Sequence, residues 1–178
     1  METVLYKKLD AADITAALFC GFSRHQEVTR CWRKENGQWV LKDIAFTEEW
    51  NGADFEHLAA ALRRTLTGGG TVLAAFDGEQ LAGFASLENG LFGSCGQYIN
   101  LPLLHVSAEQ RGRGIGRRLF SLICGEARSM RAAKLYISAH SSLESQAFYR
   151  AMGCVEAMEY NERLAGEEPC DCQMEFAL

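Results

Sequence analysis

The sequence predicts one domain of the α/β class, more closely α+β, in which a mixed sheet packs against helices. The chain has 178 residues, a length at which a single domain buries roughly 70% of its unfolded surface. Hydrophobic residues make up 48% of it and charged residues 23%, which is an ordinary globular composition. Apolar residues alternate in some segments and recur at helical spacing in others, and no linker or repeat divides residues 1–178.

The first seventy residues contain strand, hairpin and helix patterns in turn. Residues 4–9 have the pattern of a short strand, after which Asp10 is placed to cap a helix. An Asn-Gly dipeptide at position 36 lies between two runs that contain Trp and Val, and it favours a type I′ turn. We therefore predict a β-hairpin insertion over residues 29–42. Residues 53–67 are amphipathic, and three glycines end that helix.

From residue 71 onwards, short apolar runs alternate with helical periodicities. The predicted elements are strands over 71–76, 80–88, 97–106, 134–139, 153–159 and 172–176, and helices over 114–130 and 142–152. An Asp-Gly turn joins the first two of these strands into a hairpin. Pro102 lies inside the third. Because proline cannot donate to a strand ladder, we expect a bulge or an unpaired edge at that point.

Charge and composition exclude several classes of partner. The 18 Lys and Arg residues minus 23 Asp and Glu residues leave a net charge of −5, so nucleic acid is not an expected partner. No apolar run approaches the ~20 residues of a membrane span. Charged residues such as Lys7 and Asp10 interrupt any N-terminal signal pattern, so the seven cysteines are expected as reduced thiols in the cytoplasm. Cys170 and Cys172 lack a second ligand pair, so no metal is expected.

The most informative stretch is residues 111–118, Arg-Gly-Arg-Gly-Ile-Gly-Arg-Arg. It lies between a predicted strand that ends near Val106 and the start of a predicted helix. Glycines let the backbone approach a ligand closely, and the free amides and the dipole at a helix start favour phosphate. With four arginines, this order of strand, loop and helix predicts a pyrophosphate cradle. The alternative is a solvated basic turn whose glycines only cap the helix.

The glycine spacing selects among phosphate ligands. Neither the dinucleotide motif Gly-x-Gly-x-x-Gly nor a Walker Gly-Lys-Ser/Thr is present. The loop does match the acetyl-coenzyme A signature Arg/Gln-x-x-Gly-x-Gly/Ala, here Arg111-x-x-Gly114-x-Gly116. On this motif and the order of elements, most of the chain resembles the GNAT superfamily of N-acetyltransferases. The resemblance implies a mostly antiparallel sheet with helices on both faces, splayed between its fourth and fifth strands to admit the pantetheine.

The same resemblance implies acetyl-coenzyme A (acetyl-CoA) as co-substrate, without a metal, and a set of contacts to it. The residues expected in these contacts are Leu104, His105, Val106, Arg111, Gly112, Arg113, Gly114, Ile115, Gly116, Arg117, Ser142 and Ser145. The backbone around Val106 would donate an N–H group to polarise the thioester carbonyl. Ser142 stands where the family often has Asn, and a hydroxyl replaces only one of that amide's two contacts.

Two residues are candidates for proton transfer. The segment 145–154 resembles the family helix that ends in Tyr-x-x-x-Gly-Phe, which implies that Tyr149 lies near the sulfur and protonates the leaving thiolate. The alternative is an aromatic residue that only packs on the pantetheine. Glu88 is our preferred general base, with His105 and water as alternatives. The sequence does not fix the strand register that decides where these side chains point.

These observations lead to one functional hypothesis and one alternative. The hypothesis is an acetyl-CoA-dependent N-acetyltransferase that acts by direct attack of a primary amine on a small molecule, a lysine or a peptide. The alternative is a non-catalytic acyl-CoA-binding or sensor module with the same fold. The net charge favours a cationic acceptor, and the family resemblance suggests a homodimer.

Overall fold

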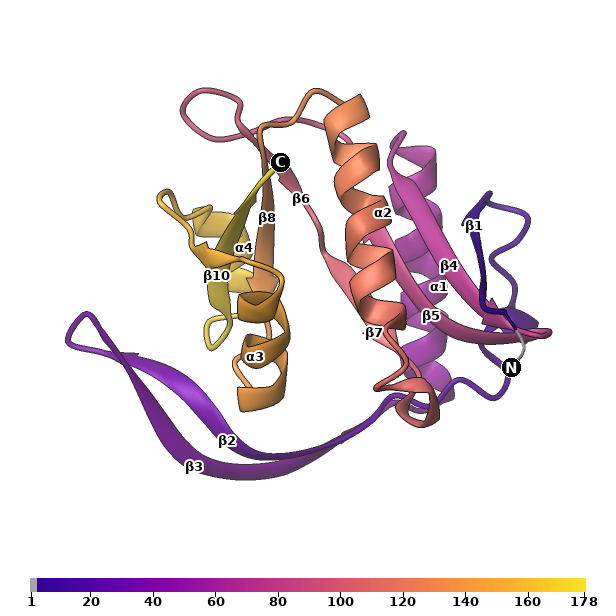
Figure 1. Ribbon diagram of the computed structural model, residues 1–178, viewed down its shortest axis with the longest axis horizontal. Coiled ribbons are helices and arrows are strands. Elements are labelled where there is room, and N and C mark those ends of the chain that lie inside the picture. The colour runs from indigo at the N-terminus through magenta and orange to yellow at the C-terminus, as the bar shows by residue number, and fades with distance from the viewer. Residues whose placement is uncertain (1–2) are drawn as a thin grey trace.

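A computed structural model describes residues 3–178 (Figure 1). Its elements in chain order are β1 (Leu5–Leu9), η1 (Ala16–Phe19), β2 (His25–Glu35), β3 (Gln38–Glu49), α1 (Gly52–Thr67), β4 (Thr71–Asp77), β5 (Gln80–Leu87), β6 (Tyr98–Asn100), β7 (Leu103–Val106), η2 (Ala108–Gln110), α2 (Ile115–Ser129), β8 (Lys134–Ala139), α3 (Leu143–Ala151), β9 (Val155–Glu156), α4 (Glu162–Glu167) and β10 (Cys172–Ala177). The described helices include none long and apolar enough to cross a bilayer.

The central sheet is divided into two halves. One half has the strand order β1-β4-β5-β7 and the other β6-β8-β10-β9. Their pairs are antiparallel except for β6 with β8, which run parallel. This mixed, mostly antiparallel sheet confirms the predicted fold class, and the two halves diverge from the β6–β7 segment (Figure 1).

The division falls at Pro102. The Leu101 amide still donates to the carbonyl of Tyr136 on β8, at 2.9 Å. On the other side, the Glu88 amide that follows β5 donates to the Asn100 carbonyl at 3.0 Å. The next donor toward β8 would be Leu103, but beyond Pro102 the residues of β7 pair with β5 instead. The predicted single strand over 97–106 is therefore two strands that belong to different half-sheets. The irregularity expected at Pro102 is confirmed: the pairing with the β5 segment shifts by one residue between Asn100 and Leu103, and the edge of β7 that faces β8 is unpaired.

Helices cover both faces of the sheet (Figure 1). Helix α2 buries Leu119 and Ile123 in a core that includes residues of both half-sheets. Helix α1 buries Leu58 and Leu62 against the opposite face of β4 and β5. The alternation of side chains along the strands supplies both cores, because successive residues of a strand point to opposite faces.

Three predicted elements differ from the structure. Instead of a helix after β1, the Asp10 carboxylate accepts the Ala12 amide at 2.8 Å in a turn, and only the short η1 follows. The hairpin extends over β2 and β3, with His25 opposite Glu49, and is longer than predicted. Charged residues on both faces of its exposed strands hide the apolar alternation by which a strand is recognised. The strand predicted over 153–159 is only the two-residue β9.

The long hairpin reaches from the body of the domain to the N-terminus of α3 (Figure 1). There the Trp32 amide donates to the Ser141 carbonyl at 2.8 Å, and the backbone of Cys31 pairs with that of Ser142 in an isolated antiparallel β-bridge. These backbone contacts fix the hairpin across the open end of the divided sheet. The base of the hairpin thereby becomes one wall of the site.

Candidate active site

A cavity of about 980 Å³ occupies the gap between the half-sheets. β7, the start of α2, helix α3 and the base of the hairpin contribute to its walls. The predicted site residues that line it are Leu104, His105, Val106, Arg111, Gly112, Gly114, Ile115, Gly116, Arg117, Ser145 and Tyr149. The structure thus brings the predicted glycine loop, its preceding strand and Tyr149 into one site.

The glycine loop has the backbone geometry of an anion cradle. Gly112 and Gly114 have φ angles of 78° and 80°, in the left-handed region that favours glycine. Gly114 precedes α2 without a side-chain cap, and the first intrahelical bond near this end runs from the Arg118 amide to the Gly114 carbonyl at 3.0 Å. The amides of residues 115–117 therefore lack intrahelical partners, as at any helix start. This arrangement fits a diphosphate.

A third glycine in the loop is required by packing. A Cβ atom at Gly116 would lie 3.3 Å from the ring of Phe148 and 3.5 Å from the side chain of Val106. Its absence lets α2 approach α3 and β7 closely at the mouth of the cavity. The loop therefore uses glycine for two reasons, backbone conformation and close approach.

The arginines of the loop point in different directions. Arg111 and Arg117 line the cavity, and Arg111 Nε donates to the Val106 carbonyl at 3.3 Å. Arg113, predicted to contact acetyl-CoA, is outside the cavity lining, because its guanidinium forms an ion pair with Asp77 and a hydrogen bond with Gln110. The ion pair lowers the pKa of the Asp77 carboxyl. The cationic part of the cavity thus includes Arg111 and Arg117.

Tyr149 is placed on α3 with its side chain largely buried and facing the cavity, at 9% exposure. Burial raises the pKa of its phenol well above the ordinary value, and the nearby Cys154 adds to this effect. The hydroxyl is therefore protonated throughout the physiological range. A neutral phenol in a cavity is a competent proton donor.

His105 is unsuited to hold a proton at neutral pH. Its ring lies 4.9 Å from that of Trp50 and 5.4 Å from that of Phe84, measured between centroids. Desolvation lowers the pKa of His105 to about 3, with a further contribution from Arg24. The imidazole is therefore neutral, and it is a weak base.

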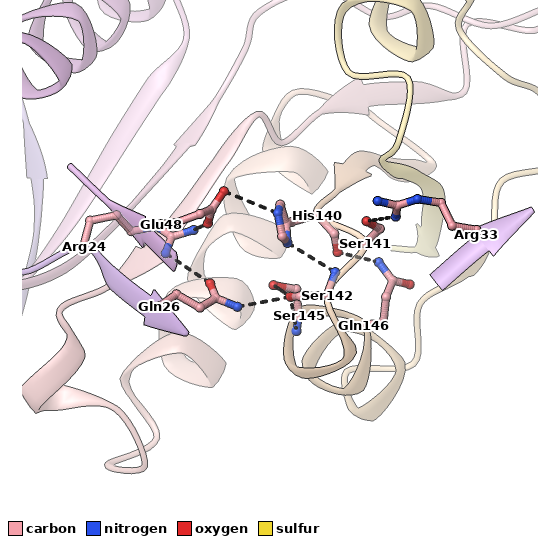
Figure 2. A network of polar contacts seen from close by, with 9 residues as sticks. All are labelled: Arg24, Gln26, Arg33, Glu48, His140, Ser141, Ser142, Ser145 and Gln146. Carbon is pink, nitrogen blue, oxygen red and sulfur yellow. Dashed lines mark hydrogen bonds and ion pairs between the residues drawn. The ribbon is translucent and has the colours of Figure 1, made fainter. Parts of the chain in front are cut away.

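Two predicted site residues, Ser142 and Glu88, form hydrogen bonds with neighbouring residues and do not line the cavity. Ser142 is fully buried, and its hydroxyl caps α3 by accepting the Ser145 amide at 3.3 Å. It also accepts Gln26 Nε2 at 3.1 Å (Figure 2). Glu88 accepts Asn100 Nδ2 at 3.0 Å, and of these two only Asn100 lines the cavity. The contact role of Ser142 and the base role of Glu88 are thus not supported by position.

The base of the hairpin adds a polar network that the sequence did not reveal (Figure 2). Arg24 Nη2 lies 2.8 Å from Glu48 Oε2, and Glu48 Oε1 lies 3.4 Å from His140 Nε2. His140, and to a lesser extent Arg24, lowers the pKa of Glu48 to about 2, while Glu48 raises that of His140. All three residues line the cavity. Their convergence depends on the tertiary fold, so no local motif indicates it.

Asp171 is a further cavity residue without a sequence signal. It precedes β10 and is partly buried. Desolvation raises its pKa to about 6, and the neighbouring carboxylates of Glu168 and Glu48 also raise it, against the lowering effect of His140. A carboxyl group that titrates near neutral pH is suited to proton transfer. Neither here nor in the rest of the part of the chain that the structure describes is there a group of three or more His, Cys, Asp or Glu residues placed to hold a metal ion.

Comparison with known proteins agrees with this geometry. Residues 38–166 match the model of the acetyltransferase (GNAT) domain family. A crystal structure of nourseothricin acetyltransferase is similar, with a TM-score of 0.70, 16% identity and 98% of each chain covered. So is a putative streptothricin acetyltransferase from Bacillus anthracis in complex with acetyl coenzyme A, with a TM-score of 0.74, 13% identity and 99% coverage of each chain. No curated protein matches the sequence.

A third similar structure is the PaiA N-acetyltransferase from Thermoplasma acidophilum in complex with coenzyme A, with a TM-score of 0.60, 13% identity and 99% of each chain covered. The family match spans well over half of the chain. The chain therefore belongs to the GNAT acetyltransferase family, and it is an acetyl-CoA-dependent acetyltransferase.

Proposed function

We propose that this enzyme transfers the acetyl group of acetyl-CoA to a primary amine on a cationic small molecule. The observation that carries the proposal is the composition of one cavity. The glycine loop, a protonated tyrosine and a group of carboxylates all line it. The first two suit the donor and its leaving group, and the third suits an ammonium-bearing acceptor.

The donor is held by the loop and by β7. The free amides of residues 115–117, with Arg111 and Arg117, bind the diphosphate. The edge of β7 that faces the gap is not paired with β8, and Leu104 to Val106 line the cavity there. The pantetheine then lies along this edge from the glycine loop toward Pro102, and one of the gap-facing amides of β7, that of Leu104 or Val106, polarises the thioester carbonyl.

The residues account for the proton balance of the reaction. The ammonium group of the acceptor first gives one proton to solvent. The neutral amine then attacks the carbonyl carbon, a C–N bond forms, the C–S bond breaks, and the nitrogen loses its second proton. Tyr149 donates its proton to the departing sulfur. Asp171 lines the same cavity and is a better-placed base than the predicted Glu88, which lies outside the lining. We therefore assign the amine's proton to Asp171, directly or through water.

Carboxylates support the choice of a cationic acceptor. The cavity lining includes four carboxylates, those of Glu48, Glu167, Glu168 and Asp171. Glu48 and Glu168 are close enough to Asp171 to raise its pKa, and Glu167 adjoins Glu168 in the chain. Negative charges gathered in one cavity raise the local concentration of a cationic substrate. Two of the similar structures are named for acetyl transfer to nourseothricin and streptothricin, which makes such antibiotics reasonable first acceptors to test. A lysine or peptide amine is the second candidate.

The test is release of free thiol from acetyl-CoA with four amines: streptothricin, spermidine, Nα-acetyllysine and butylamine. We expect the polycations to react with the lowest KM. The substitution Glu168→Gln in the cavity wall should raise the KM for polycations severalfold and leave the KM for butylamine nearly unchanged. Glu162→Gln is the matched control, since Glu162 is exposed on α4 and outside this cavity.

Two outcomes would contradict the proposal. Tight coenzyme A binding without thiol release for any amine would favour the non-catalytic module. Equal KM values for butylamine and the polycations would remove the cationic acceptor and leave the acetyltransferase activity intact. The cytoplasmic location and the homodimer remain predictions, which fractionation of cells and size-exclusion chromatography can test.

A further inference from the structure

Asn100 lies at the closed end of the gap between the half-sheets. It is the last residue of β6, opposite Tyr136 of β8, and two residues before Pro102, where the chain leaves β8 to pair with β5. The residue is 3% exposed and lines the cavity. Its side chain is therefore a fixed polar group of the cavity, at the end of the β6–β7 segment that is remote from the glycine loop.

The Asn100 amide is held in one orientation by Glu88. Nδ2 donates to Glu88 Oε2 at 3.0 Å, and the Glu88 backbone amide donates to the Asn100 carbonyl at 3.0 Å. Because a carboxylate only accepts hydrogen bonds, it selects the NH2 end of the amide. The Oδ1 atom is then the end that the side chain has left to offer. It is buried and has no partner within residues 3–178.

A buried acceptor atom without a hydrogen-bond partner is a candidate site for a donor from a ligand. A buried polar group without a hydrogen bond is costly, and native proteins contain few of them. Arg24 Nε is also buried, unpartnered and part of a cavity-lining residue, but it is itself a donor and cannot accept an amine proton. Among the described cavity residues, Asn100 Oδ1 is therefore the unpartnered acceptor that an entering N–H group can satisfy.

We propose that Asn100 binds the reacting amine of the acceptor through Oδ1, and that Glu88 is a positioning residue that orients the Asn100 amide. This inference rests on the proposed function and deepens it. Accepting one N–H of the neutral amine fixes the direction of the nitrogen lone pair relative to the thioester, which is the orientation that attack requires. Glu88 thereby acts through Asn100, and it takes no proton from the amine.

The experiment compares three variants with the wild type, using the amine of the four-member panel that reacts fastest. Asn100→Leu removes the acceptor at similar volume. Glu88→Leu frees the amide to turn, whereas Glu88→Gln keeps an oxygen that can accept Nδ2–H. We expect the amine KM to rise about three- to tenfold in both leucine variants, with the KM of acetyl-CoA unchanged within about twofold. Glu88→Gln should restore the amine KM and keep the wild-type pH profile.

Each result decides the assignment. Loss of turnover in Glu88→Gln as complete as in Glu88→Leu would make Glu88 the base and overturn the positioning role. An unchanged amine KM in Asn100→Leu, with a wild-type melting temperature, would overturn the binding role. If Asn100→Leu does not fold, the pair of Glu88 variants decides between the two roles. If the wild type reacts with none of the amines, the proposed function fails and this inference fails with it.

Discussion

Arg113 Nη1 lies 2.5 Å from Asp77 Oδ2, across the end of the β4–β5 hairpin. The ion pair ties one arginine of the glycine loop to the outer part of the sheet. Arg111 and Arg117, which lie on either side of Arg113 in the sequence, line the cavity instead. Arginines that are equivalent in the sequence thus have separate roles in the structure.

The first prediction follows from this division. Arg117→Ala should raise the KM for acetyl-CoA at least about tenfold, because hydrogen bonds between charged groups are among the stronger ones. Arg113→Ala is the matched control and should change that KM less than about twofold. Steady-state kinetics at fixed ionic strength measures both. Equal effects of the two substitutions would contradict the separation of roles.

The second prediction concerns the buried phenol. Tyr149→Phe keeps the aromatic packing but removes the proton donor, so kcat should fall by about 10²–10⁴-fold. Coenzyme A affinity, measured by calorimetry, should stay within about twofold of the wild-type value. A variant with full turnover would show that Tyr149 only packs against the pantetheine.

The third prediction separates two glycines near or on the same helix. Gly114 has a φ of 80° and open space around it, so Gly114→Ala should cost roughly 1–2 kcal/mol of stability through the backbone alone. Gly125 lies inside α2, also in open space, and Gly125→Ala should stabilise the protein by roughly 0.5–1 kcal/mol. Denaturant unfolding measures both values. Stabilisation by Gly114→Ala would be incompatible with the described loop.

The fourth prediction concerns the pH dependence of stability. The pKa of Asp171 is raised from an ordinary 3.8 to about 6, chiefly by desolvation. Between these values the unfolded state has lost the proton that the folded state keeps, so this group favours folding less as pH rises. Asp171→Asn should therefore stabilise the protein at pH 8 relative to wild type more than at pH 4.5, by on the order of 1–3 kcal/mol.

Melting temperatures of both proteins across this pH range test the sign. A larger gain at pH 4.5 would contradict the buried carboxyl. The same variant tests catalysis, because wild-type kcat/KM should rise with pH through about 6, and Asp171→Asn should lose that limb together with most of its turnover.

The glycine-loop half of the candidate site could be predicted from the sequence because it is local. Helix α2, its glycines and the preceding strand are contiguous, and their chemistry depends on backbone conformation. The acceptor half is assembled from distant segments. Gln26 and Ser142, which form a hydrogen bond, are 116 residues apart. Arg24, directly before β2, and Glu48, on β3, belong to a segment whose sequence carries no recognisable site motif. Glu88 could be placed next to the site, but only the register identifies Asn100 as its partner.

The division of the sheet at Pro102 has a consequence for substrate entry. Since β7 bonds to β5 and leaves its other edge unpaired, the separation of the two half-sheets is part of the strand pairing itself. In the proposed binding mode, an incoming thioester therefore does not have to break strand-to-strand hydrogen bonds in order to dock. The free energy of binding then does not include the cost of that reorganisation, which is the advantage of a preorganised site.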